Sequence, residues 1–360
     1  RVLVFANIHA GEVAGKEAAQ VLAREMARGL RDRWADSLVI LVAPIYNADG
    51  NEHIGLRNRP RQHGPVAGMG RRPNARGLDL NRDNAKLESA EARALSRLVQ
   101  EYDPHVALDL HTTNGTFHAY HLTYAPPLHP STDPVITTLL REEWLPAVTK
   151  SVRDRYGWEF FYYGNVPGTF GMRGERGWYT FDHRPRFTTN YLGLRNRIGI
   201  LSEAYSYATF EDRILAHGRF VEAVIDFTFA NATRVREAVE AADRGPAPGM
   251  EVALRAELVA GDTIDVLKGA VDTVRNPYTG APIYRRRDER SVERMPDYGA
   301  FRATEVTAAP AAYLVPPEFT AVIERLEAHG VRIARLDAAA EIQVSEFQID
   351  STRASEREYQ

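Results

Sequence analysis

The sequence predicts an α/β fold, in which a mixed, mainly parallel twisted sheet is flanked by helices and followed by a small β-rich region. Short apolar runs rich in branched residues, such as residues 2–5 and 37–45, alternate with longer segments whose apolar residues recur at helical spacing, such as residues 13–30. This alternation is typical of parallel sheets with right-handed crossovers. After residue 245 the pattern changes to runs of period two, which favour β-strands.

The elements can be placed in order along the chain. Two long irregular stretches, residues 51–77 and 160–197, interrupt the alternation, and long loops inside compact domains are usually functional. In the first part of the chain, buried strands are expected at residues 2–5, 37–45, 105–110 and 198–201, and helices at residues 13–30, 89–102, 135–156 and 210–242.

A Gly-Pro-Ala-Pro-Gly run at residues 245–249 marks a boundary between two regions. We expect a catalytic domain at residues 1–244 and a small β-rich region at residues 245–360. The second region contains strands near residues 251–258 and 263–267, and a helix at residues 317–329. The chain opens directly in a strand, so we expect a truncated N-terminus.

The composition limits the classes of function. Hydrophobic residues make up 44% and charged residues 26% of the chain, which is ordinary for a globular protein. The net charge of −3 gives no global field that would attract nucleic acid. No apolar run approaches the length of a membrane span. Because the chain has no cysteine, a zinc site would have to use histidine and carboxylate ligands.

Polar residues follow three of the predicted strands. His9 and Glu12 follow the first strand, His111 ends the third, and Glu203 ends the fourth. The carboxyl ends of parallel strands share one edge of a sheet, which is where open α/β sheets bind ligands. Two histidines, one carboxylate and an open position match a catalytic zinc site, and Glu203 is placed to move protons beside it.

Other interpretations of these residues stay open at this point. A surface histidine beside a glutamate that starts a helix has the same His-x-x-Glu spacing. His118 and His121 compete with His111 for the metal. Glu203 could be a structural carboxylate, although burying an unpaired glutamate is costly.

Five motifs in register resemble the zinc carboxypeptidase family of the carboxypeptidase A type, over roughly residues 1–230. They are HAGE (9–12), NADG (47–50), LDLNRD (78–83), LDLHTTNG (108–115) and the glutamate of ILSEAYSY (Glu203). The resemblance implies one zinc ion per chain, with His9, Glu12 and His111 as ligands and Glu203 as general base and acid.

The resemblance also implies groups that bind the substrate. Asn81 and Arg82 are expected to hold its terminal carboxylate, which suits a planar guanidinium. An arginine of the loop after NADG is expected to polarise the scissile carbonyl. Arg59 is our choice, while Arg61 and Arg57 stay open as alternatives.

The stretch at residues 160–197 departs from the family pattern. The tyrosine that closes over the substrate has no clean counterpart, and we assign it to Tyr191, with Tyr179 as the alternative. The same stretch should line the specificity pocket. It contains four arginines, namely Arg184, Arg186, Arg195 and Arg197. Structural ion pairs explain these arginines better than recognition of an acidic substrate side chain does.

The predicted function is that of a zinc metallocarboxypeptidase, a hydrolase that cuts a C-terminal peptide or related amide bond with a zinc-activated water. The alternative is a zinc amidohydrolase that deacylates small N-acyl amino acids on the same fold, and a third reading is a peptide-binding protein without catalysis. If Glu203 is not the base, Asp83, Asp109 and Glu175 are the substitutes. The family resemblance favours a secreted or periplasmic location, which the sequence itself does not define.

Overall fold

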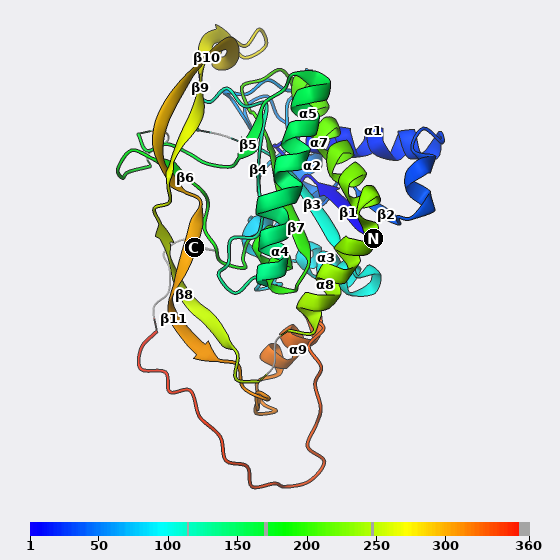
Figure 1. Cartoon of the computed structure of the whole chain (residues 1–360), viewed down its shortest axis with the longest axis vertical. Coiled ribbons are helices and arrows are strands. Elements are labelled where there is room, and N and C mark those ends of the chain that lie inside the picture. Colours follow the sequence, from blue (N-terminus) through cyan, green and yellow to red (C-terminus); the bar gives the residue numbers. More distant parts are fainter. Residues whose placement is uncertain (114, 169–171, 246–247, 353–360) are drawn as a thin grey trace.

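A six-stranded sheet forms the centre of the computed structural model, which describes residues 1–113, 115–168, 172–245 and 248–352 (Figure 1). The strand order is β2-β1-β3-β7-β4-β5. Strands β2, β1, β3 and β7 run parallel, and β4 is antiparallel to β7. The mixed, mainly parallel sheet predicted from the sequence is therefore confirmed. Its strands are β1 (Val2–Ala6), β2 (Ile40–Ala43), β3 (Val106–Thr112), β4 (Leu122–Ala125), β5 (Phe160–Tyr162) and β7 (Ile198–Ala204).

Helices cover both faces of this sheet because its strands are apolar on both sides. Val2 and Val4 pack into the larger core with α1, α5, α7 and α8, whereas Leu3 and Phe5 pack with α3 and α6 on the opposite face. The helices are α1 (Gly15–Ala27), α2 (Ala48–Glu52), α3 (Ala90–Tyr102), α4 (Pro134–Thr138), α5 (Leu145–Tyr156), α6 (Thr188–Leu194), α7 (Phe210–Ala230) and α8 (Ala232–Asp243), with a π-helical segment (Leu139–Trp144) between α4 and α5 and short 3-10 helices at Asp32–Asp36 and Leu80–Arg82.

The structure differs from the prediction in the second irregular stretch and in the long helix. Strands β5 and β6 (Trp178–Tyr179) and helix α6 lie within residues 160–197. These elements are too short to show periodicity and form through contacts with the rest of the fold. The helix expected at residues 210–242 is divided at Asn231 into α7 and α8.

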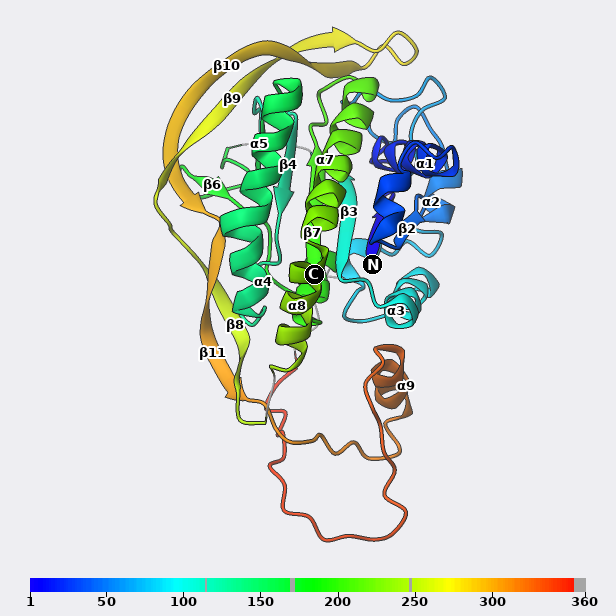
Figure 2. The same cartoon turned by 45° about the vertical axis from the view of Figure 1, so that its right-hand side comes forward.

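The C-terminal region forms two antiparallel strand pairs. Strand β8 (Glu251–Val259) pairs with β11 (Ala300–Ala308), and β9 (Thr263–Arg275) pairs with β10 (Pro282–Tyr298). We call β9 and β10 the ribbon. It runs outside α4 and α5 and arches past the upper ends of α5 and α7 (Figure 2). The β-rich character of this region is confirmed.

Several contacts join the C-terminal region to the part of the chain before it, and two of them involve named helices and strands as follows. The end of β10 pairs with β6, so that Tyr298 lies opposite Tyr179. Helix α9 (Thr320–Ala328) lies beside α3, where Ser96 Oγ donates to the Ala328 carbonyl at 2.7 Å. Among the helices of the described residues, none combines the length and apolarity needed to cross a membrane.

Candidate metal centre

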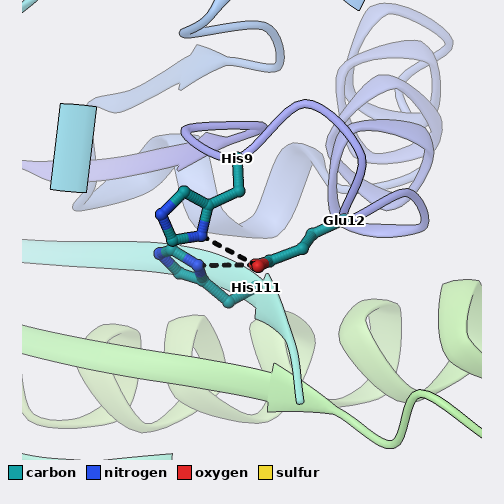
Figure 3. Close-up of side chains that lie close together, drawn as sticks. All are labelled: His9, Glu12 and His111. Carbon is teal, nitrogen blue, oxygen red and sulfur yellow. Dashed lines mark hydrogen bonds and ion pairs between the residues drawn. The ribbon is translucent and has the colours of Figure 1, made fainter. Parts of the chain in front are cut away.

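His9, Glu12 and His111 converge at the carboxyl edge of the sheet (Figure 3). Each offers one ligand atom, and these atoms all lie within 4.8 Å of one another. His9 Nδ1 lies 2.9 Å from Glu12 Oε1, and His111 Nδ1 lies 2.8 Å from Glu12 Oε2. All three side chains are buried, so the cluster is a preformed set of two nitrogen ligands and one carboxylate.

A tight turn after β1 brings His9 and Glu12 face to face. The amide of Glu12 donates to the His9 carbonyl at 2.8 Å. The turn begins and ends with non-glycine residues in the left-handed region, Asn7 at φ 68° and Ala14 at φ 109°. A Cβ at Gly11 would lie 2.6 Å from the Gly70 carbonyl oxygen, so only glycine fits where the two loops cross.

Each histidine has a second carboxylate close to its other ring nitrogen, Nε2. Asp79 Oδ1 lies 3.1 Å from His9 Nε2, and Asp109 Oδ1 lies 2.9 Å from His111 Nε2. The His9 contact has hydrogen-bond geometry, whereas the His111 contact is close but not aligned for a hydrogen bond. Carboxylates in this position orient a histidine that binds a metal. The sequence analysis missed Asp79 in this role, although its place in the LDLNRD motif was a signal.

The metal-free cluster behaves as a buried network of charges. Burial acts against the charged forms of Glu12 and His111, but the histidines and Arg59 hold the pKa of Glu12 well below its usual value. Likewise, Asp109 and Glu12 hold the pKa of His111 well above its usual value. Burial also opposes ionisation of Asp79, yet its hydrogen bond from His9 and the nearby Arg72 lower its pKa. A buried carboxylate that stays ionised is ready to bind a cation.

The loop after NADG brings arginines to the cluster. Arg59 Nη2 donates to Glu12 Oε1 at 2.7 Å. Arg72, which the sequence analysis did not single out, lies 3.6 Å from the same oxygen and donates from Nε to Asp79 Oδ2 at 2.9 Å. Arg61 instead lies over the ring of Tyr284, at 5.5 Å from its centroid.

Glu203 lies beside the cluster because β3 and β7 place it directly opposite His111 in register. It lines the cavity in front of the cluster, and its Oε2 is buried without a hydrogen-bond partner among the described residues. Burial raises the pKa of Glu203 to about 8; His111 opposes this shift and Glu12 adds to it. A carboxyl group whose pKa lies near neutrality can both accept and donate a proton.

The other carboxylates considered as bases have different surroundings. Asp83 accepts from the amides of Glu88 and Ser89 at 2.9 and 2.7 Å and so holds the segment that leads into α3. Asp109 faces His111, as described above. Glu175 is exposed and does not line the cavity.

A cavity of about 210 Å³ opens in front of His9, Glu12 and His111. Asn81 and Arg82 line it. The Arg82 guanidinium lies 4.3 Å from the centroid of the Phe187 ring and donates to the Asn81 carbonyl at 2.8 Å. The remaining lining residues are Arg72, Asp109, Thr112, Thr113, Tyr163, Phe181, Phe187, Thr188, Thr189, Leu201 and Glu203.

Neither tyrosine considered for contact with the substrate lines this cavity. Tyr191 lies in α6, and its hydroxyl is 2.8 Å from His329 Nδ1. Tyr179 stacks on Tyr298 with the ring centroids 4.1 Å apart. The tyrosine that does line the cavity is Tyr163, whose hydroxyl accepts from Asn165 Nδ2 at 2.9 Å.

Several other residues named from the sequence make packing contacts or ion pairs away from the cluster. His118 packs on Tyr205, and His121 stacks on Trp158, so neither joins the cluster. Arg184 and Arg186 pair with Asp182, Arg197 pairs with Asp103 and Asp243, and Arg195 donates to the His329 carbonyl. Asn114 of the LDLHTTNG motif and residues 246–247 of the boundary lie outside the described residues.

One known protein family is similar in sequence to the part of the chain that carries the cluster. The family model, described as zinc carboxypeptidase, matches residues 1–141. This part of the chain belongs to the zinc carboxypeptidase family. The matched segment includes His9, Glu12 and His111 but ends before Glu203 and the ribbon. The predicted family resemblance is confirmed over residues 1–141, which contain four of the five motifs.

The individual proteins that this chain resembles are distant from it. It is 30% identical over 115 residues to carboxypeptidase 2 of Trichophyton rubrum, covering 31% of this chain and 18% of that protein. It is 23% identical over 362 residues to a probable carboxypeptidase 2 of Trichophyton verrucosum, covering 93% of this chain and 62% of that protein. The chain thus spans less than two thirds of these relatives. A metallo-carboxypeptidase structure from Pseudomonas aeruginosa has a TM-score of 0.45 at 16% identity, over 65% of this chain and 58% of that chain.

Proposed function

We propose that the chain is a zinc-dependent metallocarboxypeptidase that hydrolyses a C-terminal peptide bond. One observation supports this most strongly: a preformed two-histidine, one-carboxylate cluster lies beside Glu203, a buried carboxylate with an unpartnered oxygen. Arg82, a cation suited to a terminal carboxylate, lines the same cavity.

The donor set fits zinc. Two imidazole nitrogens and a carboxylate are its usual catalytic ligands, and carboxylates behind both imidazoles fix their orientation. Bound zinc supplies Lewis acidity, which polarises a carbonyl and lowers the pKa of water to about 7. We therefore assign His9, Glu12 and His111 as the ligands of one ion per chain.

Glu203 moves the proton in this proposal. In its ionised form it accepts a proton from the attacking water, and in its protonated form it donates that proton to the leaving amine. Its position opposite His111 keeps it next to the cluster without using a ligand position. Its buried, unpartnered Oε2 is free to face the reacting atoms.

Asn81 and Arg82 hold the substrate's terminal carboxylate. No carboxylate of the described residues forms an ion pair with Arg82, and its ring contact with Phe187 fixes the guanidinium plane. A free, oriented guanidinium binds a carboxylate through two parallel hydrogen bonds.

We assign Arg59 to stabilise the oxyanion of the reaction, because its guanidinium donates to the candidate ligand Glu12. Arg72 is the alternative, since it lines the cavity itself. For the tyrosine that contacts the substrate, Tyr163 replaces Tyr191, which lies outside the cavity.

The proposal is tested by zinc analysis combined with turnover on two panels, free peptides and N-acyl amino acids. We expect one zinc per chain and hydrolysis that is faster on peptides. Faster cleavage of N-acyl amino acids would support the deacylase alternative, and stoichiometric zinc without turnover on either panel would support a binding protein.

The division of the chain at residue 244 is likewise a proposal, which limited proteolysis between residues 244 and 250 would test.

A further inference from the structure

Three segments that are distant in the sequence meet in one group of aromatic rings, Phe117, Tyr207 and Tyr284, which we call the aromatic triad. The ring centroids of Phe117 lie 5.5 Å from Tyr207 and 5.6 Å from Tyr284, and those of Tyr207 and Tyr284 lie 5.2 Å apart. All three pairs are edge-to-face, the arrangement that aromatic quadrupoles favour. Phe117 follows His111 by six residues and Tyr207 follows Glu203 by four, whereas Tyr284 belongs to β10 of the ribbon.

The backbone around Tyr284 reaches the same loops. Its amide donates to the Arg61 carbonyl at 3.0 Å, two residues from Arg59. The amide of Arg286 donates to the Tyr207 carbonyl at 2.7 Å, and its Nη2 donates to the Ala119 carbonyl at 3.1 Å. The ribbon therefore contacts the loops that follow α2, β3 and β7.

Strand β9 lies close to the backbone of the loop after β3, and this contact fixes the position of the ribbon. The amide of Ala119 donates to the Leu267 carbonyl at 2.9 Å. A Cβ at Gly269 would lie only 2.5 Å from the His118 carbonyl oxygen, so glycine permits the ribbon to touch the backbone of the β3 loop.

From inside the fold, one buried side chain ties two of these loops together. Arg213 of α7 is fully buried and has no carboxylate partner in the described part of the chain. Its Nη1 donates to the Ser206 carbonyl at 2.7 Å, and its Nη2 donates to the His63 carbonyl. The loops after α2 and β7 are thus held by Arg213 from within and by Tyr284 from outside.

We infer that Tyr284 is a positioning residue for the proposed reaction: its ring and its amide hold Arg61 and so set Arg59, two residues away, against the metal cluster. This inference rests on the proposed function. The candidate ligands do not depend on the ribbon, because His111 lies in β3, and His9 and Glu12 lie in the hydrogen-bonded turn that follows β1. Loss of the Tyr284 ring therefore loosens the proposed oxyanion arginine, while Glu203 on β7 and the cluster stay in place. The C-terminal region then has a defined task in catalysis.

The test uses three variants of the whole chain. Tyr284→Ala removes the ring, Tyr284→Phe keeps it, and Tyr278→Ala makes the same truncation at the hairpin turn of the ribbon, where the tyrosine is 60% exposed. We expect Tyr284→Ala to lower kcat on the order of tenfold to hundredfold, as misplaced catalytic groups do. KM and zinc content should stay near those of the parent protein, and Tyr284→Phe and Tyr278→Ala should match the parent throughout.

Hydrogen exchange provides a readout that does not depend on activity. In Tyr284→Ala, amides of residues 57–63 and 205–208 should exchange faster while those of β1 and β3 are unchanged. If the parent protein shows no hydrolysis but this exchange pattern appears, the proposed function fails and the structural linkage stands. Unchanged kcat and exchange in Tyr284→Ala, or an equal kcat loss in Tyr278→Ala, would overturn the inference. If Tyr284→Ala does not fold, Tyr284→Leu, which keeps bulk without an aromatic ring, takes its place under the same criteria.

Discussion

His111 and Glu203 lie side by side because adjacent parallel strands pair them directly, whereas Arg59 and Tyr207 are held by loops that a strand from the far end of the chain supports. The first pair depends on the hydrogen-bond ladder of the sheet, in which every residue is fixed by its neighbours. The second set depends on a few contacts from ring edges and backbone amides. The comparison indicates that the sheet places the candidate ligand His111 and the candidate base Glu203, while the loops and the ribbon place the candidate oxyanion group Arg59.

The most severe loss of activity should follow Glu203→Gln. The amide keeps the shape of the side chain but cannot accept the proton, so we expect kcat to fall by about 10²–10⁴-fold with zinc content unchanged. Steady-state kinetics and metal analysis measure both, and Glu175→Gln, an exposed glutamate, is the control. Loss of zinc would instead make Glu203 a ligand, and near-normal turnover would make it a structural carboxylate.

A smaller effect is expected from Arg82→Ala. Charged hydrogen bonds contribute about 1.5–3 kcal/mol, so kcat/KM for peptides with a free carboxylate should fall roughly 10–100-fold. C-terminally amidated peptides should change little. Arg184→Ala, in which an exposed arginine is removed, should leave both substrates unaffected. Equal losses on the two substrates would give Arg82 another role.

Variants of the two carboxylates that contact the histidines test the contributions of the sheet and of the loops separately. Asp109 lies on β3, and Asp79 lies in the loop before α3. Asp109→Asn and Asp79→Asn should each weaken zinc binding by about 10–100-fold, which competition with a chelator measures. Asp154→Asn, at an exposed site, is the control. If only Asp109→Asn weakens binding, His9 is oriented by the turn after β1 alone.

The mildest effect concerns stability under acid. His217 is fully buried, and burial lowers its pKa to about 3. Between about pH 6.5 and 3 the unfolded chain binds a proton that the folded chain does not, so the free energy of unfolding decreases as the pH falls, by roughly 1.4 kcal/mol per pH unit from this group. Urea unfolding of the metal-free protein at pH 7 and pH 5 should therefore show a smaller decrease for His217→Asn. The exposed His53→Asn should retain the parent slope, and a parental slope in His217→Asn would show that His217 is not the group responsible.

The metal cluster could be predicted because its geometry follows from local patterns. An apolar strand that leads into HAGE and another that leads into LDLHTTNG place His9, Glu12 and His111 at one edge once the strands are parallel. Glu203 follows from the same argument. Helix α3 was predicted close to its observed bounds because its apolar spacing and its Ser89 N-cap are both visible in the sequence.

Other features depend on contacts that sequence spacing does not reveal. Tyr191 faces His329, more than a hundred residues away, and so lies outside the cavity. Arg72 reaches the cluster because its loop doubles back at Gly68 and Gly70, where backbones nearly touch. The antiparallel strand β4 has only four residues and no periodicity of its own. Each is decided by tertiary packing, which overrides local preference.

The position of Tyr284 in the chain has a consequence for the order in which the protein is assembled on the ribosome. The sheet is complete once β7 has emerged, and roughly 80 residues still separate its end from Tyr284. At a synthesis rate of about 5–20 residues per second, the ring arrives about 4–16 s later. A nascent chain can thus bring the candidate ligands His9, Glu12 and His111 together well before the loops around them are fixed.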